Sequence, residues 1–305
     1  MASTKSLQPS VELQAPALRP PSASNTKQAP AAGAPQEKTR FRSWLGAMPF
    51  IGMHVAVLGV LWTGARPIDW AVCGALYFIR MFAVTAGYHR YFSHRAFKTS
   101  RLGQFLLAFA AETSSQKGVL WWASHHRWHH KYSDKPEDIH SPRQRGFWYS
   151  HVGWIFAPGM DTYNEARVRD LAAYPELCFI SRFWMLPPLT LALAVFLTLG
   201  WSGLVVGFFL STVLLYHGSF VINSLAHVFG RRRYDTEDDS RNSAVLALIT
   251  LGEGWHNNHH RCMTSARQGF FWWEVDISYA ILKMLSWFGL VWDLKQPPKK
   301  LLQAQ

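Results

Sequence analysis

The sequence is poor in cysteine and has none of the cysteine motifs that hold metals or disulfides. Among its 305 residues only Cys73, Cys178 and Cys262 occur, and no two of them form a CxxC pair. This excludes a zinc ribbon, a thioredoxin-like motif and a disulfide framework. A GxGxxG fingerprint, an iron–sulfur cysteine run and an HPGG-type haem segment are also missing. A redox reaction on this chain would therefore need a separate electron donor.

The chain carries a large positive charge but no nucleic-acid-binding module. Its formal net charge is +12, and the basic residues lie beside apolar runs, which favours a membrane surface over a nucleic acid. No apolar segment follows Met1 closely enough to act as a cleaved signal peptide. Residues 1–43 are rich in Ala, Pro, Ser, Gln and Lys, so they are predicted to be a disordered cytosolic tail before a functional domain at residues 44–305.

Four apolar runs predict an all-α integral membrane protein. They cover residues 45–63, 68–88, 183–201 and 204–223. Each is about 20 residues long, the length of a helix that crosses a ~30 Å hydrocarbon core. Very short connections join the runs in pairs, which predicts four transmembrane helices in two hairpins. A further stretch, residues 102–111, is too short to span and is predicted to be an interfacial or re-entrant helix.

Positive charge is distributed unevenly around these runs. All of the 31 lysines and arginines except Arg66 and Arg80 lie in the tail, in residues 89–182 or in residues 224–305. The positive-inside rule places these segments in the cytosol, where the latter two are expected to form a helical cap. Arg80 would cost about 2.5–3.5 kcal/mol in lipid, so it is predicted to face the protein interior, unless the second run ends a few residues earlier.

Most of the 14 histidines fall into three short clusters. They are HRYFSH at residues 89–94, HRWHH at residues 126–130 and HNNHH at residues 256–260. On a helix, the three rings of an HxxHH segment lie within about 100° of one another on one face. The HxxxxH spacing opens to about 140° on an ideal α-helix, so it predicts a helix end or a local bulge. Asn223 and His227 form a looser i, i+4 pair.

These clusters can meet on one side of the membrane. His89 follows the second run and Asn223 closes the fourth, while the other clusters lie in the predicted cap. A closed zinc site needs only four ligands, whereas eight clustered histidines with His227 and Asn223 suffice for two ions. The sequence therefore predicts a binuclear metal site, although imidazole suits zinc, copper, iron and nickel alike. A metal transporter or sensor is disfavoured, because the runs contain only the isolated His54 and His217.

The segments HRYFSH, HRWHH and GEGWHNNHH resemble the three histidine boxes of the membrane fatty-acid desaturases, specifically the acyl-CoA Δ9 (stearoyl-CoA) desaturase branch in its bacterial and plant-like form. The resemblance covers residues 44–292, with GYHR at residues 87–90 and NSLAH at residues 223–227 in the expected order. It implies two irons, O₂ as co-substrate and a cis Δ9 double bond in an acyl chain. One iron would be held by His89, His94, His126, His130 and His259, and the other by His129, His227, His256 and His260, with Asn223 bound through water.

The sequence departs from the animal enzymes just before the second box. There, Ser124 and His125 replace an Arg-Asp pair that lies near the acyl carrier. The resemblance therefore leaves the carrier open between CoA and a membrane lipid, while it places Gln116 and Trp122 at the bend of an acyl tunnel. Basic side chains that could bind phosphates of the carrier are Arg90, Arg95, Arg127, Lys131, Arg143 and Arg145.

The resemblance also implies partners for the metal site. Outer ring nitrogens of metal ligands usually donate to carboxylates, and candidates are Glu112, Asp134, Glu137, Asp138 and Glu253. Electrons would come from ferredoxin, or from cytochrome b5 with its reductase, and a basic cap would suit an acidic donor. A di-iron lipid or alkane hydroxylase is the alternative enzyme. The membrane would be the bacterial inner membrane or the endoplasmic reticulum.

Overall fold

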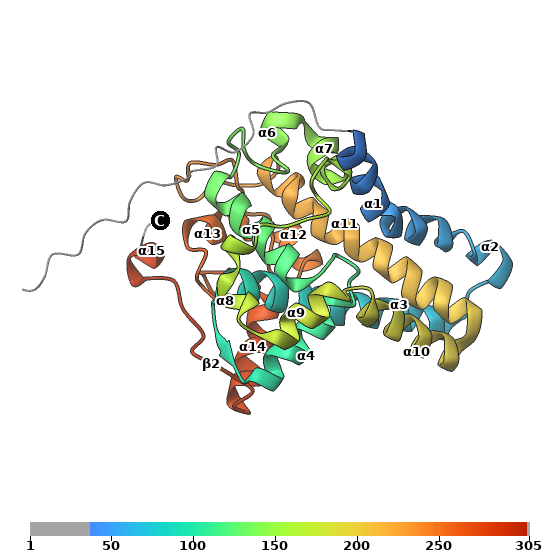
Figure 1. Cartoon of the computed structure of the whole chain (residues 1–305). Coiled ribbons are helices and arrows are strands. Elements are labelled where there is room, and N and C mark those ends of the chain that lie inside the picture. The colour runs from blue at the N-terminus through green and yellow to red at the C-terminus, as the bar shows by residue number, and fades with distance from the viewer. Residues whose placement is uncertain (1–36, 304–305) are drawn as a thin grey trace, which may run out of the picture. The chain divides into compact units, whose positions relative to one another are not determined.

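The computed structural model describes residues 37–303. Helices account for nearly all of the regular structure in this range (Figure 1). The predicted tail lies outside this range except for residues 37–43, which form the first turns of a helix. The extension of this helix beyond the apolar run was not predicted, because these residues carry no apolar periodicity.

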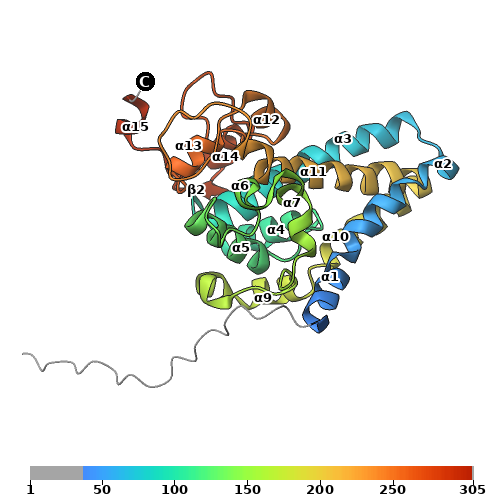
Figure 2. The ribbon, with the colours of Figure 1, turned by 90° about the horizontal axis from the view of Figure 1, so that it is seen from above.

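The four apolar runs form the long helices of the protein. The first becomes α1 (Glu37–Val57) and α2 (Val60–Thr63), and the second becomes α3 (Pro67–Phe82) with the π-helix η1 (Ala83–Ser93). The third becomes α10 (Leu186–Ser202), and the fourth becomes the π-helix η4 (Gly203–Leu210) with α11 (Ser211–Asn223). These helices lie side by side in both views (Figure 1, Figure 2).

Within residues 37–303, three helical stretches are long and apolar enough to cross a membrane: Trp44–Thr63, Pro67–Ser93 and Leu186–His227. The third stretch has 42 residues, and it bends at Gly200, whose φ of 71° and ψ of −160° are not helical. Beyond this bend η4 packs back against α10. The four predicted runs therefore appear as three candidate spans, of which the last is folded on itself.

The remaining elements form the region that carries most of the histidines. Between η1 and α10 they are β1 (Lys98–Thr99), α4 (Arg101–Glu112), α5 (Val119–Tyr132), α6 (Pro142–Arg145), α7 (Phe147–His151), η2 (Gly153–Phe156), η3 (Glu165–Arg167), α8 (Arg169–Ala172) and α9 (Pro175–Arg182). After α11 they are η5 (Leu225–His227), α12 (Ala244–Ile249), α13 (His256–Arg261), α14 (Ile277–Trp287), β2 (Val291–Trp292) and α15 (Lys299–Gln303). The short stretch at residues 102–111 forms α4, and its interfacial position stays a prediction.

Two of the contacts between distant parts of the chain bear on the predicted fold. Strand β1 pairs antiparallel with β2, with Lys98 opposite Trp292; this small sheet was not predicted, because two-residue strands carry no periodic signal. Arg80 is only 1% exposed and donates to Thr212 Oγ1 at 2.7 Å on α11. The prediction that this guanidinium faces the protein interior is confirmed.

Candidate metal centre

The first histidine cluster lies at the end of the π-helix η1. The backbone N–H of His94 donates to the carbonyl of His89, five residues earlier, at 3.3 Å. A π-turn contains more residues than an α-turn, so side chains five positions apart return to one side of the helix. The two ring centroids consequently lie 4.9 Å apart. The spacing predicted a local distortion, and the structure shows it as a π-helix of 11 residues.

The nine histidines of the predicted site gather into two groups from η1, α5, η5 and α13. Within each group one nitrogen of every ring lies within 4.8 Å of the others. The first group contains His89, His94, His126, His130 and His259, and the second contains His129, His227, His256 and His260. The structure thus brings together the two sets that the family resemblance implied.

The contacts between ring nitrogens fit a bound cation better than hydrogen bonds. His259 Nε2 lies 2.9 Å from His89 Nε2 and 2.8 Å from His130 Nε2. A neutral ring nitrogen has either one proton or one lone pair, so this atom cannot serve both neighbours at once, whereas a cation can accept all three lone pairs. Metal–nitrogen bonds of about 2.1 Å place nitrogens ~3.0 Å apart at right angles and ~3.4 Å apart in a tetrahedron. The contacts of 2.9 Å and 2.8 Å are therefore close enough for these nitrogens to share one ion.

Burial keeps most of these imidazoles neutral. Burial, reinforced by neighbouring rings, holds the pKa well below its usual range for His94, His126, His130, His256 and His259. Burial also lowers the pKa of His260 to about 4. At His129 burial is outweighed by the Asp138 carboxylate, which raises the pKa. Neutral rings keep the lone pair that a metal ion requires.

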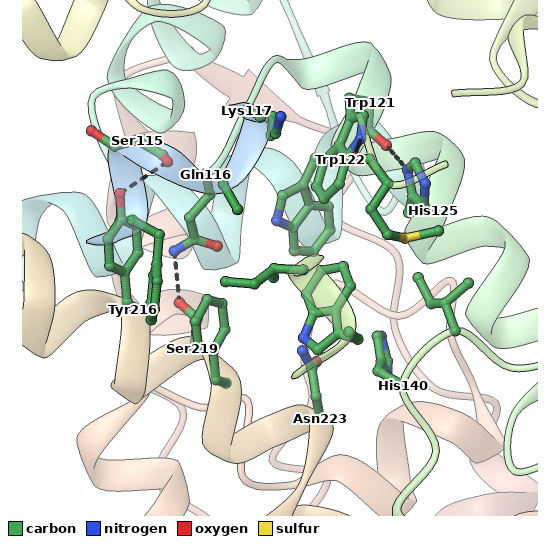
Figure 3. A pocket seen from close by; sticks show the side chains of 18 of the residues that line it. Ser115, Gln116, Lys117, Trp121, Trp122, His125, His140, Tyr216, Ser219 and Asn223 are labelled. Atoms are coloured by element: carbon green, nitrogen blue, oxygen red, sulfur yellow. Dashed lines mark hydrogen bonds between the residues drawn. The ribbon is translucent and has the colours of Figure 1, made fainter. Parts of the chain in front are cut away.

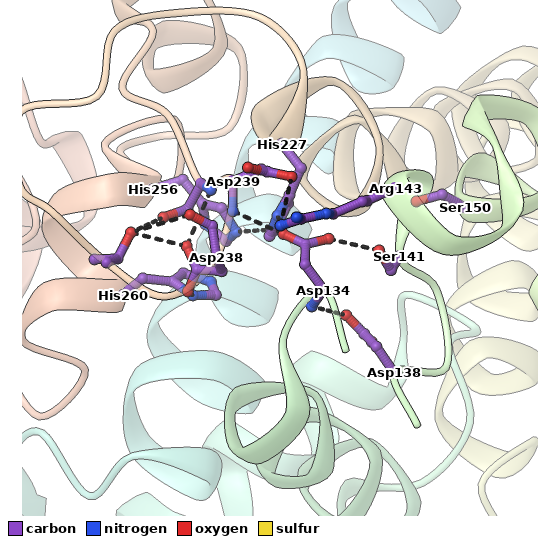
Figure 4. A network of polar contacts seen from close by, with 12 residues as sticks. Asp134, Asp138, Ser141, Arg143, Ser150, His227, Asp238, Asp239, His256 and His260 are labelled. Atoms are coloured by element: carbon purple, nitrogen blue, oxygen red, sulfur yellow. Dashed lines mark hydrogen bonds and ion pairs between the residues drawn. The ribbon is translucent and has the colours of Figure 1, made fainter. Parts of the chain in front are cut away.

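Carboxylates hold the outer nitrogens of four of these rings, and Figure 4 shows two of the pairs, Asp134 with His227 and Asp238 with His260. His129 Nδ1 lies 3.0 Å from Asp138, His227 Nδ1 lies 2.8 Å from Asp134, and His260 Nδ1 lies 2.6 Å from Asp238. His89 Nδ1 pairs with Glu253. Such contacts fix the orientation of each ring and increase its basicity as a ligand.

Three of the five predicted carboxylates therefore contact ligand rings, and two do not. Glu112 is buried away from the rings and accepts from the backbone N–H of Val119 at 2.9 Å, where α5 begins; burial raises its pKa to about 8. Glu137 is exposed and its carboxylate contacts no ligand ring. Asp238 was missed, because it lies 18 residues before the third box, where only folding could bring it to His260.

An apolar pocket leads to the histidine groups (Figure 3). Trp121, Trp122, Tyr216 and Phe220 form much of its wall. A second cavity shares Trp122, His126, Ser219 and Asn223 with it and continues past His89, His129 and His256. The two cavities therefore adjoin along a path that passes the candidate metal centre.

The predicted pocket residues lie along this path. Gln116 donates to Ser219 Oγ at 3.0 Å across the first cavity. Trp122 is stacked on Tyr88 and on His126, with ring centroids 5.3 Å and 4.8 Å apart. Asn223 lines both cavities beside the second histidine group, and its contact to a metal through water stays a prediction.

The basic residues predicted to bind a carrier differ in their surroundings. Arg90 is 1% exposed and its guanidinium holds Glu253 and Asp276, so it has no free surface for a phosphate and the expected role is not supported there. Arg95 and Arg127 both pair with Asp170. Lys131 is exposed beside aromatic rings. Two further cations have partners of their own: Arg143 pairs with Asp239 at 3.6 Å, and Arg145 donates to the Tyr149 hydroxyl at 2.6 Å.

The histidines expected to be isolated are in fact joined. His54 Nε2 lies 3.1 Å from His217 Nε2, and His217 Nδ1 lies 3.0 Å from His151 Nε2. Each of these nitrogens has one histidine partner, so hydrogen-bond donors and acceptors can alternate along this row of three rings without a metal. The expectation of isolation is wrong, because residues far apart in sequence on α1, α7 and α11 meet in the fold.

Comparison with known proteins agrees with this centre. Residues 68–284 match the family model for fatty acid desaturases. The sn-1 stearoyl-lipid 9-desaturase of Anabaena variabilis is 34% identical over 263 residues, which cover 85% of this chain and 96% of the relative. The sn-2 palmitoyl-lipid 9-desaturase of Nostoc sp. (strain 36) is 32% identical over 264 residues, or 84% of this chain and 91% of the relative. The acyl-CoA C20 Delta5-desaturase of Anemone leveillei is 36% identical over 250 residues, or 81% and 80%. The chain therefore belongs to the fatty acid desaturase family and is an oxidoreductase that desaturates fatty acyl chains.

Proposed function

We propose that the two histidine groups each bind one iron ion and that the protein uses O₂ to introduce a cis Δ9 double bond into a saturated acyl chain. The observation that carries this proposal is the convergence of nine ring nitrogens into two groups beside an apolar pocket. Bound iron supplies the oxidising chemistry that removes two hydrogens from an unactivated CH₂–CH₂, which no side chain can do. The Δ9 position is supported by the names of the two bacterial relatives.

Side chains of the protein would hold the irons and the acyl chain in position. Asp134, Asp138, Asp238 and Glu253 hold four ligand rings in place. The aromatic wall around Trp122 excludes water from the acyl chain and would place one pair of methylenes beside the irons. Asn223, at the end of α11, would reach the second iron through a water molecule.

The proposed membrane arrangement has four crossings. The bend at Gly200 and the packing of η4 on α10 support two antiparallel crossings within the third candidate span. The basic segments then lie on one side of the membrane with the histidine boxes, which is the cytosolic side by the positive-inside rule. The membrane is the bacterial inner membrane or the endoplasmic reticulum.

The carrier and the electron donor are separate molecules in this proposal. The relatives are named for both lipid-linked and CoA-linked acyl chains, so either carrier fits. Reduction of O₂ to water requires two electrons beyond those taken from the acyl chain, and they would come from ferredoxin or from cytochrome b5 with its reductase. The basic cap favours an acidic donor. The family match favours desaturation over hydroxylation.

Expression in a desaturase-deficient host tests the function. Total fatty acids would be analysed for new double bonds and their position, with His129→Ala as the inactive control. A new cis Δ9 product from the wild type alone is expected. Wild-type protein that contains iron but yields no unsaturated product would refute the proposal, and a hydroxylated product would establish the alternative.

A further inference from the structure

A short helix between α11 and the third histidine box exposes an unusual amount of apolar surface. Residues 243–252 contain no charged side chain. In this segment α12 (Ala244–Ile249) leaves Val245 and Leu248 each 64% exposed and Ile249 45% exposed. Contiguous exposed apolar surface generally marks a contact with another molecule or with a membrane.

Contacts with α3 and α11 set the depth of this helix. Tyr77 Oη on α3 donates to the carbonyl of Ile249 at 2.9 Å, and Leu251 packs against Met81 and Leu215. Tyr77 lies ten residues after Pro67, where α3 begins, or ~15 Å along the helix axis. Measured from Pro67, this depth lies within a ~30 Å hydrocarbon core, so the end of α12 lies beside the lipid-exposed part of the span.

The backbone of the segment has hydrogen bonds where the helix ends. Thr250 Oγ1 donates to the carbonyl of Leu246 at 2.6 Å, and the N–H of Gly252 donates to that of Ala247 at 2.7 Å. The carbonyl of Leu251 accepts from the N–H of Ser278 at 2.9 Å. Irregular backbone is tolerated at membrane depth when its polar groups are satisfied within the protein, and these bonds satisfy backbone groups at the point where α12 ends.

We propose that residues 244–251 are a re-entrant element that enters the leaflet on the histidine side, with Val245 and Leu248 in contact with lipid acyl chains. Beyond this element the chain turns at Gly252, whose φ of 126° favours glycine, and Glu253 then pairs with His89. Immersion of α12 thus holds the third histidine box at the membrane surface. The inference rests on the proposed membrane orientation of α3 but not on the enzymatic activity.

Fluorescence quenching of single-cysteine variants tests this placement. Leu248→Cys and, as a second position, Val245→Cys are made in a background without the three native cysteines and labelled with an environment-sensitive dye. The full chain is reconstituted in phosphatidylcholine vesicles. Quenching is measured with nitroxide on the lipid acyl chains and with aqueous iodide. Leu197→Cys on α10, where the side chain is 72% exposed, is the control for lipid contact, and Met263→Cys, 40% exposed beyond α13, is the control for water.

Dye at both α12 positions is expected to be quenched by the acyl-chain nitroxide and protected from iodide, as at Leu197. Quenching by iodide to the extent seen at Met263 would overturn the inference. Iodide access at Leu197 would overturn the membrane orientation and the inference with it. A failure of the fatty-acid assay alone would reject the proposed function and leave the labelling result standing.

Discussion

Replacing Asp134 by asparagine isolates the effect of one negative charge on a ligand of the second histidine group. Asp134 Oδ2 accepts from His227 Nδ1 at 2.8 Å and from the N–H of Asp239 at 2.9 Å, while Oδ1 accepts from Ser141 Oγ at 2.6 Å. Burial opposes ionisation of this carboxyl, but the hydrogen bond from His227 and the others hold its pKa below the usual range. The carboxylate therefore supports His227 as a charged acceptor.

The size of the effect follows from these contacts. An asparagine oxygen can replace Oδ2 and keep the bonds from His227 and Asp239, while the Ser141 hydroxyl rotates to accept from the new amide. Only the charge is lost. A hydrogen bond to a charged group contributes about 1.5–3 kcal/mol and a neutral one about 0.5–1.5 kcal/mol, so the difference of about 1–1.5 kcal/mol corresponds to about tenfold in affinity for the second iron. Asp134→Ala removes every contact and should approach a loss of about 100-fold.

Iron content after equilibration with graded chelator concentrations would measure this series. The wild type should hold two irons per chain, and the variants should lose one of them at lower chelator concentrations, in the order alanine before asparagine. Glu137→Gln is the matched control, because this carboxylate is exposed in the same loop and contacts no ligand ring. If the Asp134→Ala variant retained both irons as strongly as the wild type does, the assignment of His227 as a ligand supported by Asp134 would be refuted.

Three other substitutions have distinct expected outcomes. Burial raises the pKa of Glu112 to about 8, so its contribution to stability is fully present below the unfolded pKa of about 4.3 and is lost as pH rises towards 8. Glu112→Gln should therefore make the denaturation midpoint less dependent on pH between these two values. An unchanged pH dependence would contradict the burial of this carboxyl. Arg90→Met removes the guanidinium that pairs with Glu253 and Asp276 in the interior, so thermal unfolding should show a loss of about 3–5 kcal/mol, and wild-type stability would count against the buried pairs. Trp122→Ala enlarges the path beside the metal centre and should broaden the double-bond positions seen by mass spectrometry, whereas a single unchanged position would show that Trp122 does not shape the pocket.

Local patterns in the sequence were enough to predict the family and the histidines that cluster in the candidate metal centre. Apolar runs of about 20 residues predict long helices whatever surrounds them, and HxxHH places its rings on one helical face through local geometry alone. The family prediction is confirmed by the match over residues 68–284. The distortion that HxxxxH requires was also predictable, because an α-helix cannot align His89 with His94.

Tertiary structure decided the features that depend on contacts between distant residues. Asp238 reaches His260, and Arg90 turns inward to Asp276, only because loops far apart in sequence pack together. The path from the pocket to the metal centre is likewise assembled from α1, α5 and α11. The sequence by itself determined which residues could bind metal, since that depends on residue type and local spacing. Only the fold decided how they are supported by carboxylates and which cavities adjoin them, since those properties depend on long-range packing.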